Sequence, residues 1–139
     1  MRWPTRRREG FTLVELLVVI VVLAVLAAIV LPKFMNSSAR SKESGLRTDL
    51  KLIRNAISAF QVDTTKYPLS LDGLAKTDRT KVKVADGSYV VANDWHGPYI
   101  EAVPNDPVTG AAFTYDKATG KVTSSATGNG LDGTAYSTW

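Results

Sequence analysis

Glu15 is the residue whose type and position most require a chemical explanation. It lies in residues 11–31, a stretch in which only Thr12 and Glu15 are strongly polar. A carboxylate is costly in an apolar phase, and a charged residue inside a membrane segment usually marks a functional site. We therefore expect this stretch to do more than anchor the chain.

A second group of polar residues, Asp94, His96 and Asp106 around Trp95, is the best material for an enzyme active site. A lone histidine in a turn beside a proline is more typical of a surface or packing residue than of a general base. The sequence contains no nucleophile motif, metal-ligand spacing or phosphate-binding loop to accompany it. We therefore expect no catalysis.

The apolar segment, residues 11–31, is 21 residues long. As a helix rising ~1.5 Å per residue it can cross a hydrocarbon core of ~30 Å. The preceding cluster Arg6-Arg7-Arg8 predicts a cytoplasmic N-terminus, with everything after Leu31 on the far side of the membrane. The segment is thus a membrane span or a helix buried in a filament.

Three simpler interpretations of this segment fit less well. A cleaved secretory signal rarely carries a carboxylate, and the nearest small-x-small site, Ser37-Ser38-Ala39, lies beyond Pro32. A plain uncleaved anchor tolerates Glu15 poorly. A soluble core helix that is apolar on every side needs a much larger protein to cover it.

Composition narrows the function classes further. The net charge of +4 arises mainly in the first ten residues, where four arginines stand against Glu9. The other Lys and Arg residues are scattered among the carboxylates, so we expect no binding to nucleic acid. The chain has no cysteine, which excludes disulfides and thiolate metal sites.

A helix is expected to continue beyond the apolar segment. Pro32 lacks an amide hydrogen, so the helix should bend there, and it should end near Asp63, ahead of a tyrosine-proline step. Glu43 and Arg47, four residues apart, are interpreted as a solvated face. Five apolar residues recur at helical spacing and predict a face that rests on a globular head: Leu46, Leu50, Ile53, Ile57 and Phe60.

The head is predicted to hold a small antiparallel sheet. Ser70 is a candidate cap for a short helix at residues 71–74. Strand signals occupy residues 88–92, 112–115 and 121–125.

Residues 116–120 read as a hairpin turn between the last two strands. Packed on the helix, this sheet would bury Phe113, Tyr115 and Val122. The predicted fold class is α+β, with a long N-terminal helix whose C-terminal half packs on the sheet.

Residues 7–17, Arg-Arg-Glu-Gly-Phe-Thr-Leu-Val-Glu-Leu-Leu, resemble the leader and cleavage site of type IV prepilins and pseudopilins. The resemblance implies that a prepilin peptidase cuts after Gly10 and methylates the new N-terminal residue, Phe11. It also implies that Glu15 of an incoming subunit meets the Phe11 amine of its neighbour and sets the axial register. Opposite charges attract strongly in low dielectric, and an unpaired partner is costly. A proline at the position of Pro32 is a further family feature.

The head is similar to that of the major pseudopilin of type II secretion systems, which has the pilin fold. Four segments carry the similarity: Tyr67-Pro68, Gly73-Leu74, residues 94–100 and residues 103–107. A final tryptophan, here Trp139, and the lack of cysteine also fit that family.

One departure concerns calcium. The family's head has a calcium-binding loop with several acidic residues, whereas residues 127–133 offer one carboxylate, Asp132, and one amide, Asn129. Asp116 is a further candidate ligand. Because calcium takes six to eight oxygens, we expect weak binding or none, and no required cofactor.

The resemblance implies a structural subunit of a pseudopilus filament that drives type II protein secretion. Residues 1–10 would be the cleaved leader, residues 11–63 the long helix and residues 64–139 the globular head. Within the helix, residues 11–31 would be the transmembrane segment and later the filament core.

The same resemblance implies partners and location. The precursor would cross the bacterial inner membrane once, with its head in the periplasm or outside, before joining a periplasmic or extracellular homopolymer through the N-terminal helices. Partners would be the prepilin peptidase, an assembly platform with its ATPase, minor pseudopilins and, before assembly, the lipid bilayer. The main alternative is a type IV pilus pilin serving adhesion, motility or DNA uptake. A membrane-tethered binding module is a further one.

Overall fold

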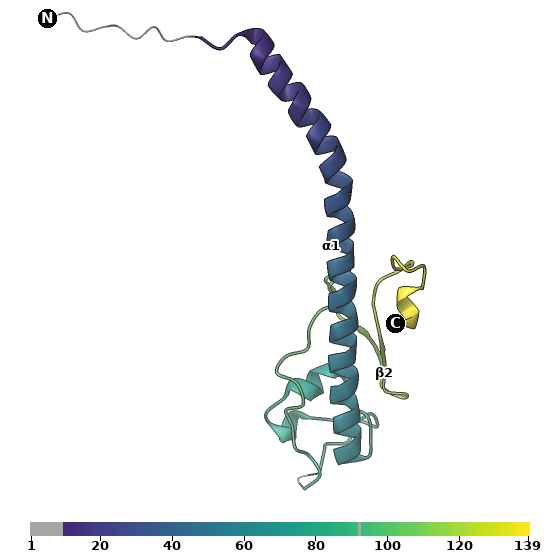
Figure 1. The fold of residues 1–139 in the computed structure, drawn as a ribbon. Helices are drawn as coiled ribbons and strands as arrows, with labels where there is room; N and C mark the ends of the chain where they lie inside the picture. Colours follow the sequence, from purple (N-terminus) through teal and green to yellow (C-terminus); the bar gives the residue numbers. More distant parts are fainter. Residues whose placement is uncertain (1–9, 92) are drawn as a thin grey trace, which may run out of the picture. The chain divides into compact units, whose positions relative to one another are not determined.

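A long helix is the main element of the chain. The structure, a computed structural model, describes residues 10–91 and 93–139, apart from the side chains of Met35 and Asn36. Helix α1 runs over Leu13–Thr64, 52 residues, and continues through Pro32 (Figure 1). The long helix expected from the sequence is confirmed, and the bend at Pro32 stays a prediction.

The expected leader, with its basic cluster, falls almost wholly on residues 1–9, which lie outside the described residues.

The chain forms two compact units, one that ends at Ser38 and one that comprises Ala39–Trp139. In the first unit, large apolar side chains from Leu13 to Phe34 are exposed all around the helix, each by at least 44%. Among the described residues, α1 is the one helix long and apolar enough to cross a membrane. Such a surface is unfavourable in water, so this half of α1 requires lipid or neighbouring helices around it.

The second unit builds its core along one stripe of α1, as the sequence predicts. The five stripe residues from Leu46 to Phe60 are at most 3% exposed. The stripe contacts apolar residues from the rest of the unit: Leu71, Leu74, Val82, Val84, Ile100, Phe113 and Val122.

A two-stranded sheet lies in this unit. Strands β1 (Thr114–Asp116) and β2 (Lys121–Thr123) are antiparallel, with Tyr115 opposite Val122. The turn between them is closed by a hydrogen bond from the Gly120 amide to the Asp116 carbonyl at 2.8 Å, and Gly120 has a φ of +70°. The hairpin is therefore confirmed, although both strands are shorter than predicted.

The burial predicted for the sheet is confirmed for Phe113 and Val122, which are 6% and 0% exposed. Tyr115 is only half-buried, and its hydroxyl donates to the Pro68 carbonyl at 2.8 Å.

Three short 3₁₀ helices in the described residues connect the other elements: η1 (Leu71–Ala75), η2 (Arg79–Lys81) and η3 (Tyr136–Thr138). The predicted short helix is confirmed as η1, but the Ser70 hydroxyl makes no capping hydrogen bond.

The strand predicted at residues 88–92 is wrong for its described part. Tyr89 makes only an isolated antiparallel bridge with Lys83, and Ala92 lies outside the described residues. Tyr89 and Val91 are both more than half exposed, and Val90 is the one buried residue in the described part of the segment. A single buried side chain gives too short a buried face to hold a longer strand in register.

Asp106 is fully buried and holds two segments of the second unit together. One carboxylate oxygen accepts from the Val108 amide at 2.8 Å, and the other accepts from the Ser124 hydroxyl and from the Ser125 amide at 3.0 Å. Burial acts to raise the pKa of Asp106, but these hydrogen bonds outweigh it, and the pKa lies below 3.8. A buried carboxylate with this many donors is structural.

Truncation of the core stripe tests this packing. Phe60→Ala removes a fully buried side chain and should lower the free energy of unfolding by about 3–5 kcal/mol, measured by denaturant titration of the full chain in detergent. Leu52→Ala, on the same helix at 47% exposure, is the control and should change it by well under half as much. Equal losses for the two variants would contradict the assigned core.

Asp106 should make the head acid-sensitive. Because its folded-state pKa is lowered, the unfolded chain binds its proton more readily, so this contribution is present above the unfolded pKa and is lost as the pH falls through the folded one. We expect the stability difference between the wild type and Asp106→Asn, about 1–3 kcal/mol near pH 6, to shrink below about pH 4. Thermal unfolding of both proteins across this range measures it, and a pH-independent difference would contradict it.

Candidate functional site

The predicted assembly residue, Glu15, lies in the first turn of α1. One of its carboxylate oxygens accepts hydrogen bonds from the Thr12 amide at 2.9 Å and the Thr12 hydroxyl at 3.0 Å. The Glu15 amide in turn donates to the Thr12 hydroxyl at 3.3 Å. This reciprocal pattern is a capping box, which satisfies free donors at the start of a helix.

Sequence reasoning missed the role of Thr12. The signal was present, because a threonine followed three residues later by glutamate, just before an apolar run, is the signature of a capping box.

The residues at the predicted cleavage site lie ahead of the helix. Gly10, Phe11 and Thr12 have no helical or strand assignment, and both Gly10 and Phe11 are exposed. A Cβ atom on Gly10 would meet nothing within 4 Å, so the fold itself does not require glycine there. The backbone around the Gly10–Phe11 peptide bond is therefore accessible to an external binding partner.

A second polar site joins α1 to the C-terminal loop, residues 127–139. Glu43 is 8% exposed, and its carboxylate accepts from the Leu131 amide at 2.7 Å and from the Tyr136 hydroxyl at 2.9 Å. Burial and this hydrogen bond raise the pKa of Tyr136, so the phenol remains a donor.

The interpretation of Glu43 as part of a solvated face is thus wrong. Glu43 lies three residues before Leu46 and continues the buried stripe of α1, which the helical spacing could have indicated.

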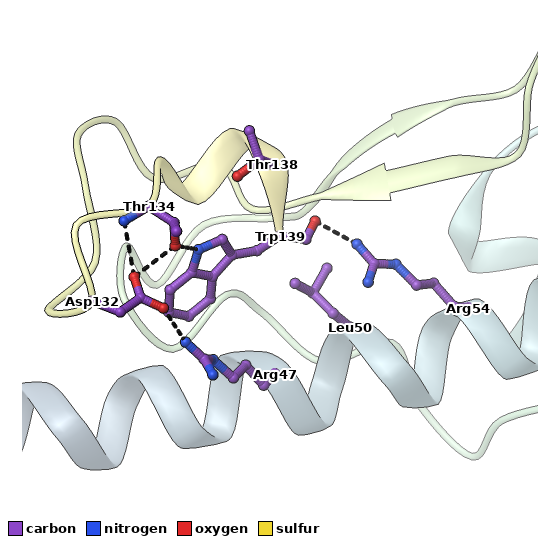
Figure 2. A pocket seen from close by; sticks show the side chains of 7 residues that line it. All are labelled: Arg47, Leu50, Arg54, Asp132, Thr134, Thr138 and Trp139. Atoms are coloured by element: carbon purple, nitrogen blue, oxygen red, sulfur yellow. Dashed lines mark hydrogen bonds and ion pairs between the residues drawn. The ribbon is translucent and has the colours of Figure 1, made fainter.

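Arg47 binds the same loop from the next turn of α1. Its guanidinium donates to Asp132 at 2.6 Å, and its Cζ atom lies 4.2 Å from the centre of the Trp139 ring (Figure 2). The Trp139 indole donates to the Thr134 hydroxyl at 2.6 Å. Two turns further on, Arg54 donates to the carbonyls of Trp139 and Val122.

The predicted calcium ligands do not fit a calcium ion. One Asp132 oxygen accepts from the Thr134 amide and hydroxyl, the other accepts from Arg47, and these bonds lower the Asp132 pKa. Asn129 pairs through a backbone bridge with Ala135, and Asp116 bonds within the β1–β2 turn. Within the described residues no three ionisable ligands gather around one point.

The residues considered for catalysis do not form one site. His96 lies 3.3 Å from Asp63 at the end of α1, and Asp106 is occupied in the core. Asp63 also accepts from the Tyr99 hydroxyl at 2.7 Å, and burial with this bond raises the pKa of Tyr99 to about 12. His96 is largely exposed, as expected for a surface histidine.

Comparison with known families decides the assignment. The family described as "Type II secretion system (T2SS), protein G" matches residues 33–137, which is most of the chain. The family described as "Prokaryotic N-terminal methylation motif" matches residues 5–31. The chain belongs to the type II secretion system protein G family.

Individual relatives support this membership. The type II secretion system core protein G of Aeromonas hydrophila is 33% identical over 103 residues, which cover 73% of this chain and 68% of the relative. Those of Pseudomonas aeruginosa and Escherichia coli are 33% and 31% identical and cover 73% and 74% of this chain, with 69% and 68% of the relatives. No solved structure matched the chain.

Membership in the protein G family makes the chain a pseudopilin. It is a structural subunit of the pseudopilus of type II secretion and not an enzyme. Its apolar helix and methylation motif are those of an inner-membrane pseudopilin processed by prepilin peptidase.

Close packing of the C-terminal loop in this pseudopilin should make the stability of the head sensitive to a side chain at Gly130. A Cβ atom at position 130 would lie 2.5 Å from the Trp139 ring, so Gly130→Ala must displace the ring and should cost about 1–3 kcal/mol in denaturant unfolding. Gly45→Ala is the control. Gly45 lies within α1, and a Cβ atom there would meet the Pro107 side chain at an ordinary contact distance of 3.5 Å. A neutral Gly130→Ala would contradict the packing.

Proposed function

We propose that this pseudopilin is cut after Gly10, methylated at Phe11, and assembled through residues 11–31 with Glu15 setting the axial register. The observation that carries the proposal is the first unit of the structure. Its helix is apolar and exposed on every side, and it carries one carboxylate, in its first turn.

Cleavage is supported by the open backbone ahead of α1. A peptidase must bind its substrate in an extended form, and the exposed, non-helical Gly10 and Phe11 offer such a form without unwinding the helix. Cutting the Gly10–Phe11 bond creates an amine at Phe11 that is four residues from Glu15.

The capping box reduces the free-energy cost of keeping the Glu15 carboxylate in the membrane before assembly. The Thr12 amide and hydroxyl supply two donors to one carboxylate oxygen, which lowers the cost of desolvating the charge. They supply no positive charge, so the carboxylate still gains from a cationic partner. The amine of a neighbouring Phe11 is such a partner.

The axial register between two neighbouring helices follows from the presence of few charged groups along residues 11–31. From residue 16 to residue 31 every side chain is Leu, Val, Ile or Ala, so contacts between two such helices change little when one slides along the other. The pairing of one carboxylate with one amine selects a single offset, because every other offset leaves two charges unpaired in low dielectric.

Assembly then exchanges lipid contacts for contacts between helices. An inner-membrane platform driven by a cytoplasmic ATPase would extract each subunit, with minor pseudopilins as further partners and the head held in the periplasm. Because the apolar surface is covered by lipid before extraction and by other helices afterwards, it never faces water. The growing pseudopilus would push exoproteins through an outer-membrane channel.

Replacement of Glu15 separates processing from assembly. Glu15→Ala should leave cleavage and methylation intact, seen as the mass of the methylated mature chain, while the amount of pseudopilus in sheared cell fractions falls severely. Glu101→Ala removes an exposed carboxylate in the head and serves as the control. Normal filament yield from Glu15→Ala would refute the register role, and an unprocessed chain would refute the assigned cleavage site.

A further inference from the structure

We propose that Arg47 takes the structural place of the family's calcium ion and closes the C-terminal loop without any divalent cation. The guanidinium contacts both the Asp132 carboxylate and the Trp139 ring (Figure 2). The head of this pseudopilin would therefore keep its C-terminal loop, residues 127–139, ordered whatever the calcium concentration.

The first support is the chemistry of Asp132, the one carboxylate in the loop. Both of its oxygens already accept hydrogen bonds, from Thr134 on one side and from Arg47 on the other. A calcium ion would have to displace the guanidinium and then find at least five more oxygens. The nearby Glu43 carboxylate already accepts from the Leu131 amide and the Tyr136 hydroxyl, and the described residues hold no group of three or more His, Cys, Asp or Glu side chains that could bind a metal.

The second support is the geometry around Arg47. A planar guanidinium can donate to a carboxylate through its fork of N–H groups while its flat face lies over an aromatic ring, a geometry that the compact ammonium of lysine and a hydrated metal ion lack. An ion pair as exposed as this one contributes little alone. The stacking against Trp139 fixes the guanidinium and shields one of its faces from water, which strengthens the pair.

The third support is that two further turns of α1 hold the same loop. Glu43 accepts from the Leu131 amide and the Tyr136 hydroxyl, and Arg54 donates to the Trp139 carbonyl. The Tyr136 and Trp139 rings meet edge to face, 5.1 Å apart. Three side chains along α1 thus fasten the loop at three places, with Arg47 one turn after Glu43 and two turns before Arg54.

A fixed guanidinium and an exchangeable ion have different consequences. Arginine stays protonated at every pH at which proteins fold, and it is covalently present at one copy per chain. Closure by Arg47 therefore does not vary with metal supply, whereas closure by calcium follows mass action.

Hydrogen exchange of the loop tests the proposal on the full mature chain in detergent micelles. Amide exchange in residues 127–139, followed by mass spectrometry, should be the same in EDTA and in about 10 mM calcium chloride, a concentration above the ~1 mM dissociation constants of weak calcium modules. In Arg47→Met we expect exchange of these amides to speed up by about fivefold or more, because the loop opens more often.

Two variants keep the outcome interpretable. Lys51→Met removes a positive charge from an exposed position one turn along α1 and should leave exchange in the loop unchanged. Arg47→Lys keeps the charge without the planar fork and should lie between the wild type and Arg47→Met.

Slower exchange on adding calcium to the wild type would overturn the proposal, as would unchanged exchange in Arg47→Met. Neither measurement requires a filament, so failure here is distinguishable from failure of the assembly function.

Discussion

Every side of an α-helix must contact either other apolar groups or water, and the two halves of α1 meet this requirement differently. Up to Leu31 the helix exposes apolar side chains on all sides, so a protein this small cannot cover it, and lipid or other subunits must do so. From Leu46 to Phe60 one stripe is covered by the chain itself, and the other sides are hydrated. Because the N-terminal half of α1 exposes apolar side chains that the chain cannot cover, the chain requires lipid or other subunits around that half.

The buried stripe of α1 also determines which charged side chains of the helix can reach the C-terminal loop. Glu43 lies on the stripe at its start, while Arg47 and Arg54 each follow a fully buried residue, Leu46 or Ile53. Since one residue turns a helix by about 100°, such neighbours sit at the edge of the stripe and reach the loop that packs beside it. The core packing of α1 therefore fixes the positions of the polar groups that hold the C-terminal loop, which lies beside the helix in Figure 1.

The sequence predicted what depends on repeated local patterns. Helical spacing gave the stripe from Leu46 to Phe60, and turn chemistry gave the hairpin between β1 and β2. Partners that lie far along the chain leave no local pattern: Leu131 and Tyr136, which take no part in the helical spacing, are about 90 positions from Glu43, and the prediction of a solvated Glu43 is therefore wrong. The strand expected around Tyr89 failed because apolar residue types do not reveal whether anything covers them.

Glu15, Glu43 and Asp106 each accept hydrogen bonds from donors of their own unit, but in two different environments. Glu43 and Asp106 are buried beneath donors of the folded head, so they have little to gain from another molecule. Glu15 is held only by Thr12, in an exposed first turn, by donors that carry no net charge. A cation is a better partner for a carboxylate than a hydroxyl or an amide, and the advantage grows in low dielectric. Under the proposed assembly, Glu15 would therefore gain by exchanging the Thr12 donors for the amine of a neighbouring subunit.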